Sequence, residues 1–199
     1  MPSFQIKALQ DKETITVYQA FDENISQSAV KHQTFVSPPF RMERMTWIKP
    51  SFLWMMYRSG WATKPKQEHI LSIRILKSGF DWALQNACLS NFNEAIHSSY
   101  DVWKDKLHSS PVRVQWDPER DIYFNPLDFR TIQVGLSHDA VVRYLNNWIV
   151  SITDITQTCK AVENYILEGE SSKALQLLPV EIEYLPNINA VHKINLNLV

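Results

Sequence analysis

The amino-acid sequence predicts an α+β fold that forms a single domain over residues 1–199, with a core from about residue 5 to residue 186. Short segments with the alternating pattern of strands are mixed with short helical segments, without regular strand–helix–strand alternation. The composition, with 45% apolar and 21% charged residues, is that of a folded globular chain. We therefore expect a mixed, mainly antiparallel sheet with several short helices.

The first long strand and the first two helices are predicted from residues near their ends. Residues 14–21, TITVYQAF, are rich in the β-branched and aromatic residues that favour a strand. Asp22 can then cap a short helix by accepting a backbone N–H. A second helix is expected from a Ser51 cap to about Ser59, where Gly60 can end it. Because this second helix is apolar on all sides, we expect it to be buried, with basic residues at its two ends.

The remaining segments are assigned from the same two patterns of hydrophobic spacing. Strands are expected at residues 69–76, 111–116, 121–124, 130–134 and 180–185, with a hairpin turn at DPER, residues 117–120. Helices are expected at residues 79–88 after a Ser78 cap, at 99–107, at 138–148 after Ser137, from about Asp154, and at 171–178.

Charge is distributed unevenly, although the net charge is only −1. Residues 41–66 contain six basic residues and the single acid Glu43, whereas the chain from Ala161 onward contains five glutamates and two lysines. A net charge near zero gives no global field that would recruit nucleic acid or an anionic membrane. An anionic ligand would therefore have to be held locally, by the basic middle of the chain.

Several classes of protein are disfavoured by what the sequence lacks. The four glycines are widely separated, which excludes the glycine-rich phosphate loops of Rossmann and P-loop proteins. The two cysteines lie far apart, and we expect them to be reduced thiols of a cytoplasmic protein. The N-terminus lacks the apolar core of a signal peptide, and the longest apolar runs are far below the roughly 20 residues of a membrane span. We expect no membrane association.

No metal site or common nucleophile motif is predicted. The six histidines are scattered and form no HExxH motif. The segment WDPERD has the alternating acids of a calcium loop but lacks the loop's glycine and its final glutamate. There is also no GxSxG nucleophile elbow.

The strongest functional signal is the segment TWIKPSFLWMMYRSGW, residues 46–61, in which cations flank an apolar and aromatic run. Arginine and lysine beside aromatic rings suit a ligand with a phosphate and a flat base. We expect Lys49, Arg58 and Lys64 to bind the anion, with Trp61 as a stacking platform. The alternative is that the tryptophans belong to the core and the cations form a solvated rim.

Arginines within predicted strands extend this signal. Arg74, Arg113 and Arg130 each lie at a strand position, where an arginine either points into solvent or is held inward by an anion. Arg130, close to Gln133 in the sequence, is a candidate for the second arrangement. We therefore add Arg74, Arg130 and Gln133 to the candidate ligand-binding residues.

Four stretches of the chain resemble a known family. The segments ITVYQAF, FRMERMTWIKPSFLWMMYRSGWATKPKQEHILSIRI, SPVRVQWDPERD and RTIQVGLS with YLNNWIVSITDIT are similar to the domain-of-unknown-function family numbered 4291. The resemblance covers residues 5 to 186, nearly the whole chain. It implies no activity and no catalytic residues.

A weaker resemblance links the chain to the ADP-ribosyltransferase superfamily. It would place Gln19 on the first strand, where that superfamily has histidine or arginine, and Glu181 and Glu183 in a late Glu-x-Glu strand. These three residues would then be catalytic and NAD the cofactor, with a glutamate stabilising the positive charge that develops as nicotinamide leaves. The alternative is that both glutamates lie on the exposed face of an amphipathic strand.

Three hypotheses for function follow. The leading one is a basic, tryptophan-lined cleft for a nucleotide or a nucleic-acid end, with or without ADP-ribosyl transfer. Transfer requires Glu181 or Glu183 near Arg58, whereas a binding module requires a basic groove without a converging acid or base and has an affinity that falls steeply with salt. In the third hypothesis, Trp61 and Phe40 anchor a protein partner.

Overall fold

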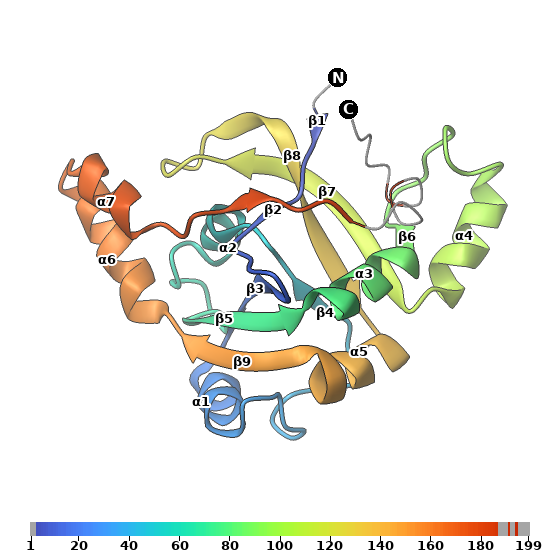
Figure 1. Cartoon of the computed structure of the whole chain (residues 1–199), viewed down its shortest axis with the longest axis horizontal. Helices are drawn as coiled ribbons and strands as arrows, with labels where there is room; N and C mark the ends of the chain where they lie inside the picture. Colours follow the sequence, from blue (N-terminus) through green and yellow to red (C-terminus); the bar gives the residue numbers. More distant parts are fainter. Residues whose placement is uncertain (1–2, 187–190, 192–193, 195–199) are drawn as a thin grey trace.

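The computed structural model describes residues 3–186, 191 and 194, and over these residues it confirms the α+β class (Figure 1). The strands are β1 (Ser3–Phe4), β2 (Lys7–Ala8), β3 (Thr14–Phe21), β4 (Thr46–Ile48), β5 (His69–Leu76), β6 (Ala87–Leu89), β7 (Val112–Arg120), β8 (Pro126–Leu136), β9 (Ile149–Asp154) and β10 (Ile182–Glu183). The α-helices are α1 (Glu23–His32), α2 (Phe52–Ser59), α3 (Lys77–Gln85), α4 (Tyr100–Ser109), α5 (Asp139–Arg143), α6 (Thr156–Leu167) and α7 (Ser171–Leu177), and a π-helix η1 (Tyr144–Trp148) follows α5.

The largest sheet has the strand order β1-β8-β7-β6, and β4 also pairs with β8. The long strands β7 and β8 are antiparallel, as are β4 and β8, whereas β1 and β6 run parallel to their neighbours. A second sheet, with the order β3-β5-β9, is antiparallel throughout. The pairing is therefore mainly antiparallel, as expected, and the parallel pairs that make it mixed lie in the largest sheet.

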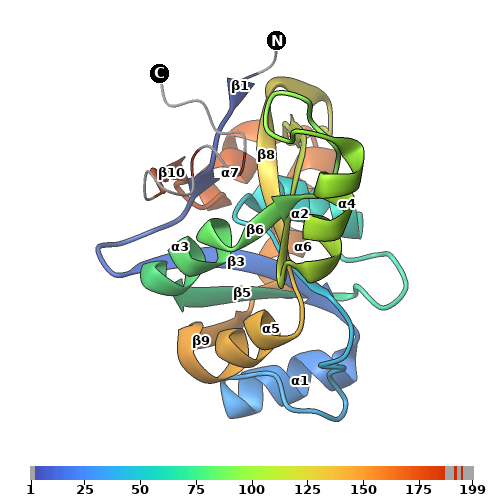
Figure 2. The same ribbon diagram turned by 90° about the vertical axis from the view of Figure 1, so that its right-hand side faces the viewer.

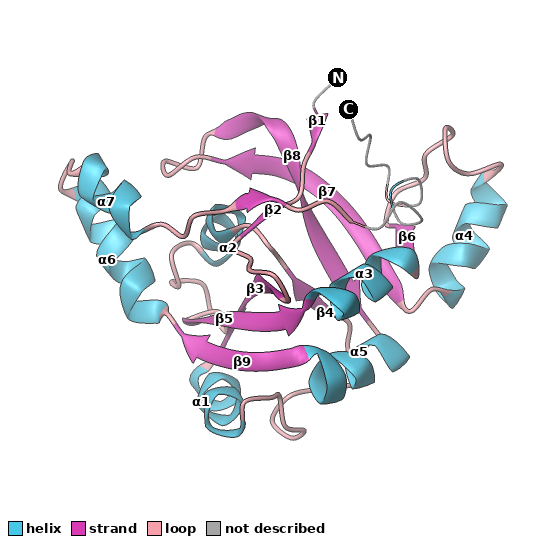
Figure 3. Ribbon diagram, viewed as in Figure 1, coloured by secondary structure: helices cyan, strands magenta, loops and turns pink. Residues whose placement is uncertain are grey.

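The main hydrophobic core lies between these two sheets. Val17 of β3 and Ile73 of β5 belong to the same buried cluster as Val134 and Leu136 of β8. In Figure 3, β7 and β8 run diagonally while β5 and β9 cross below them, with α6 and α7 at one end of the molecule and α4 at the other. An antiparallel bridge between Tyr18 and Lys49 joins β3 to the chain just after β4.

The helix α2 has the ends that the sequence predicts. The side chain of Ser51 accepts the backbone N–H of Trp54 at 3.1 Å, which caps the N-terminus. Gly60 has φ of 60° and donates its backbone N–H to the carbonyl of Met56, so a left-handed residue ends the helix. Most of the helix is buried, as its apolar sequence requires. At α1, Asp22 also caps as expected, because it accepts the N–H of Ile25 at 3.0 Å.

The expected turn at DPER is wrong. These residues continue β7, which runs without a break from Val112 to Arg120, and the chain reverses only after Asp121. The carboxylate of Asp121 accepts the backbone N–H groups of Tyr123 and Asn125, which forms the turn. The proline at position 118 is tolerated because the register of β7 shifts between Pro118 and Arg120.

Other expected elements and boundaries also differ. Residues 121–124, expected as a strand, form the turn between β7 and β8, and the helix expected to reach residue 88 ends at Gln85, before β6. The helix α3 starts at Lys77 without a side-chain cap, so Ser78 lies inside it. The helix expected over residues 138–148 changes from α5 to the π-helix η1 at Tyr144. The last strand contains only Ile182 and Glu183, which pair with β2. Within the described part of the chain, no helix combines the length and apolar character needed to cross a membrane.

Candidate functional site

A cavity of about 530 Å³ opens beside the C-terminal half of α2, and we call it the α2 cavity. Its walls come from β4 and the residues after it, from α2, and from β7 and β8. The lining residues are Trp47, Lys49, Trp54, Tyr57, Arg58, Gln115, Asp117, Pro118, Arg120 and Gln133.

Strand register explains why the polar residues of this set meet. Gln115 of β7 lies directly opposite Gln133 of β8, and directly opposed residues project from the same face of a sheet. Asp117 lies two residues beyond Gln115 and therefore projects from the same face. On the other side of β8, Trp47 lies opposite Gly135. A Cβ atom at position 135 would be only 3.0 Å from the Trp47 ring, so the glycine leaves space for this tryptophan.

Lys49 is the least expected charge in the site. Only 7% of its surface is exposed, and its ammonium makes one long hydrogen bond, 3.4 Å to the carbonyl of Trp47. Lys49 forms none of the ion pairs found among the described residues. Burial lowers the pKa of Lys49 to about 8, the charge of Arg58 also lowers it, and Asp117 opposes the fall. Arg58 is exposed at the end of α2.

Asp117 is held in place by two amides. One carboxylate oxygen accepts the Nε2 group of Gln133 at 2.6 Å, and the other accepts Nε2 of Gln115 at 2.8 Å. Each carboxylate oxygen can accept a further hydrogen bond. Asp117 can therefore receive a hydroxyl or amino group of a ligand without losing either glutamine.

An arginine stacks on aromatic rings at one wall of the cavity. The guanidinium carbon of Arg120 lies 4.1 Å from the centre of the Tyr57 ring and 5.9 Å from that of Trp54. These two rings stack on each other with their centroids 5.2 Å apart. Arg120 also donates to the carbonyl of Phe124 at 3.2 Å. The wall combines a fixed positive charge with flat apolar surface.

The structure thus brings together three of the residues proposed from the sequence, Lys49, Arg58 and Gln133, but it places Trp61 and Lys64 elsewhere. Trp61 is buried in the core and stacks on Phe124, with 5.6 Å between ring centroids. Lys64 donates to the carbonyl of Arg58 at 2.8 Å, so it caps the C-terminus of α2. Trp61 is therefore a residue of the core, as the alternative interpretation of the sequence expected.

Two of the three strand arginines, Arg74 and Arg130, were proposed as ligand-binding residues, and both lie away from the α2 cavity. Arg74 donates to the carboxylate of Asp11 at 2.6 Å on the second sheet. Arg130 and Gln133 project from opposite faces of β8, because they lie three positions apart and side chains alternate between the two faces along a strand. It donates to the carbonyl of Trp116 at 2.9 Å. Arg130 and Gln133 therefore do not converge.

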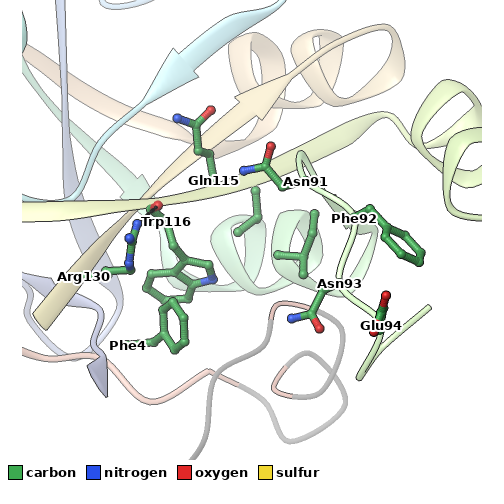
Figure 4. A pocket seen from close by; sticks show the side chains of 10 residues that line it. Phe4, Asn91, Phe92, Asn93, Glu94, Gln115, Trp116 and Arg130 are labelled. Atoms are coloured by element: carbon green, nitrogen blue, oxygen red, sulfur yellow. Dashed lines mark hydrogen bonds between the residues drawn. The ribbon is translucent and has the colours of Figure 1, made fainter. Parts of the chain in front are cut away.

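Arg130 lines a separate cavity of about 540 Å³ (Figure 4). Phe4, Trp116 and Arg130 lie together on one side of it, and the loop from Asn91 to Glu94 lies on the other. Figure 4 also shows Gln115 pointing away from Trp116, toward the face of the sheet that carries the α2 cavity. The large sheet thus separates two cavities.

The residues that the ADP-ribosyltransferase resemblance would make catalytic lie at separate places. Gln19 is buried, donates to Thr46 at 2.6 Å and accepts from Tyr144 at 2.8 Å, so both ends of its amide are used within the protein. Glu181 accepts the backbone N–H of Phe52 at 2.7 Å, at the N-terminus of α2. Glu183 is exposed on β10. None of the three lines the α2 cavity.

A second acidic residue near Glu181 was not predicted as a site residue. Glu119 is 5% exposed, and burial raises its pKa against the opposing hydrogen bond from the backbone N–H of Arg120. Burial also raises the pKa of Glu181 to about 8, with a further contribution from the charge of Glu119. Glu119 was missed because its segment was assigned to a solvated turn. The described residues contain no cluster of three or more His, Cys, Asp or Glu side chains suited to a metal ion.

Comparison with known families gives one result. The model of a family described as Domain of unknown function (DUF4291) matches residues 5–184. The chain belongs to the DUF4291 family. A search of the curated proteins finds no match, and nothing in these comparisons supports the ADP-ribosyltransferase resemblance. Because the DUF4291 description names no activity, a function for this member has to be argued from its own residues.

Proposed function

We propose that this DUF4291 protein binds a nucleotide, or the phosphorylated end of a nucleic acid, in the α2 cavity. The observation that carries the proposal is Lys49, a buried cation beside a second cation, Arg58, with no carboxylate in ion-pair contact among the described residues. Buried charges in proteins are normally paired, and an unpaired one destabilises the fold. An anion bound between Lys49 and Arg58 would remove that destabilisation.

The rest of the cavity fits the other parts of a nucleotide. The rings of Trp47, Trp54 and Tyr57 supply flat apolar surface beside the cations, which suits a base. Asp117, oriented by its two glutamines, offers an acceptor for a sugar hydroxyl or a base amino group. A volume of about 530 Å³ lies within the range of about 300–1,000 Å³ that is usual for small-molecule sites.

Binding is better supported than ADP-ribosyl transfer, although the cavity differs from the expected basic groove in one respect, because the carboxylate of Asp117 also lines it. Transfer requires a carboxylate from the Glu-x-Glu segment close to Arg58, whereas Glu181 lies at the opposite end of α2 and Glu183 lies on β10. NAD therefore enters as one of the ligands to be tested. A protein-partner site anchored by Trp61 and Phe40 is disfavoured as well, because both side chains are buried in the core.

Thermal-shift and calorimetric titrations with NAD, ATP, GTP, cyclic nucleotides and short oligonucleotides test the proposal at low and moderate salt. A ligand present at 100 times its dissociation constant adds about 2.7 kcal/mol to the free energy of unfolding, which is readily seen as a raised Tm. We expect at least one phosphate-bearing ligand to bind, and Lys49→Met and Arg58→Ala to remove the effect.

Lys104→Ala is the matched control, because it removes one exposed lysine on α4, which does not line the cavity. It should bind as the wild type does. If no phosphate-bearing ligand raises the Tm of the wild type, or if Lys49→Met and Lys104→Ala bind equally well, the α2 cavity is not a nucleotide site.

A further inference from the structure

A second basic cavity lies next to the α2 cavity along the chain. It has a volume of about 360 Å³, and Phe21, Phe40, Arg41, Arg44 and Lys66 are among its lining residues. The two phenylalanine rings give it an apolar wall, whereas the three cations lie toward solvent. We call it the α1 cavity, because residues at the start of α1 complete it.

Two segments border both cavities. Met45 and Thr46 line the α1 cavity, and Trp47 and Lys49, which follow closely, line the α2 cavity. Met45 and Trp47 also pack over the same glycine of β8, so their side chains lie side by side. The loop after α2 leads from the α2 cavity to Lys66 in the α1 cavity, and in Figure 2 α2 and this loop lie toward the right-hand side of the molecule.

The cations of the α1 cavity have no acidic partners among the described residues. Arg41, Arg44 and Lys66 form none of the ion pairs found there. The carboxylate of Asp22, at the edge of the cavity, is already used to cap α1. The carboxylate of Glu68 accepts the backbone N–H of Lys66 at 2.9 Å and forms no ion pair with its ammonium. The α1 cavity thus has positive charge available for more than one phosphate.

We infer that the ligand is a single-stranded nucleic acid, whose terminal nucleotide lies in the α2 cavity and whose chain continues past Trp47 into the α1 cavity. This inference rests on the proposed function and specifies its ligand. The backbone from Met45 to Lys49 spans about 13 Å when extended, so phosphates held in the two cavities belong to different nucleotides. A dinucleotide cofactor would place only a base and a sugar in the α1 cavity, and these groups do not need the three cations found there. The aromatic residues between the cations suit stacked bases of a single strand.

Fluorescence anisotropy with labelled oligo-dT and oligo-U, from the dinucleotide to the octamer, tests the inference, with calorimetry for the mononucleotide. We expect affinity to rise with length. In the double variant Arg41→Ala/Arg44→Ala, affinity for the octamer should fall at least tenfold while mononucleotide affinity is retained. The slope of log K against log salt should become shallower by about 0.7 for each phosphate that the variant can no longer bind. Retained mononucleotide binding also shows that the variant is folded, and Lys104→Ala is the control for loss of charge.

Several outcomes would overturn the inference and leave the proposed function standing. They are a mononucleotide that binds as tightly as the octamer, a double variant that binds the octamer as the wild type does, or a preference for NAD that Arg44→Ala abolishes. Failure of every nucleotide and oligonucleotide to bind the wild type would overturn both the inference and the proposed function.

Discussion

Replacing Lys49 by methionine is expected to stabilise the protein and to remove its ligand binding. Methionine keeps the unbranched shape of the side chain and removes a buried charge that has one hydrogen bond, of 3.4 Å. The fall in the pKa of Lys49 from 10.5 to about 8 corresponds to about 3 kcal/mol of destabilisation when the amine is protonated. We therefore expect Lys49→Met to raise the free energy of unfolding at neutral pH by about 1 to 3 kcal/mol.

The pH dependence identifies the cause of this effect. Below pH 8, Lys49 is protonated in both the folded and the unfolded state, so the whole destabilisation is present. Between about pH 8 and 10.5 the folded protein has lost this proton and the unfolded chain has kept it, so the wild type gains stability as pH rises. The advantage of Lys49→Met over the wild type should therefore be constant below about pH 8 and disappear by about pH 10.5.

Urea denaturation of both proteins at a series of pH values measures this difference, because other groups that titrate at high pH affect the two proteins equally. Lys104→Met, at an exposed position, should change the free energy of unfolding by less than about 0.5 kcal/mol. If Lys49→Met is less stable than the wild type by more than about 1 kcal/mol at every pH, Lys49 is a structural residue. Lys49 would then give no support to an anion site in the α2 cavity.

Three further predictions concern residues around α2. Arg58→Ala should lower nucleotide affinity at least tenfold, as measured by calorimetry. Because the side chain is exposed, the same change should alter the free energy of unfolding by less than about 0.5 kcal/mol, as measured by melting. The wild type should lose stability as pH rises from 4.5 to about 8, because Glu181 ionises in the unfolded chain at a lower pH than in the folded protein. Glutamine cannot ionise, so the free energy of unfolding of Glu181→Gln should fall less over this range, as measured by urea denaturation. Gly135→Ala should weaken binding and lower the Tm, because the new Cβ would lie 2.7 Å from the sulfur of Met45 and 3.0 Å from the Trp47 ring. A Tm and an affinity equal to those of the wild type would show that these side chains move aside without cost.

The sequence predicts an element well where the signals that fix its ends are local. β3 and β5 coincide with the predicted strands because their composition and alternation are unambiguous over eight residues each. The α2 helix is equally clear, since Ser51 and Gly60 act through hydrogen bonds to residues only a few positions away. The segment DPER was mispredicted because the partner that holds it extended, β8, follows it in the chain, and pairing with this strand outweighs the local turn preference of proline.

The candidate site was predicted only in part, for a related reason. Composition alone locates a basic, aromatic segment and so finds Lys49 and Arg58. It does not show that β7 pairs with β8 in the register that places Asp117 and Gln115 beside Gln133. It also does not show which cations are already used, as Arg74 is by Asp11 and Lys64 by the end of α2. These facts depend on strand order and on contacts between distant segments.

The position of the α2 cavity relative to its helix has a consequence for binding strength. An anion is favoured at the N-terminus of a helix and disfavoured at the C-terminus, where the backbone carbonyls point outward. The α2 cavity lies beside the C-terminal half of α2, so the helix gives a bound phosphate no help. Lys64 partly offsets this, because its ammonium occupies two of the terminal carbonyls. Affinity must therefore come from the side-chain charges of Lys49, Arg58 and Arg120, and we expect it to fall steeply with added salt.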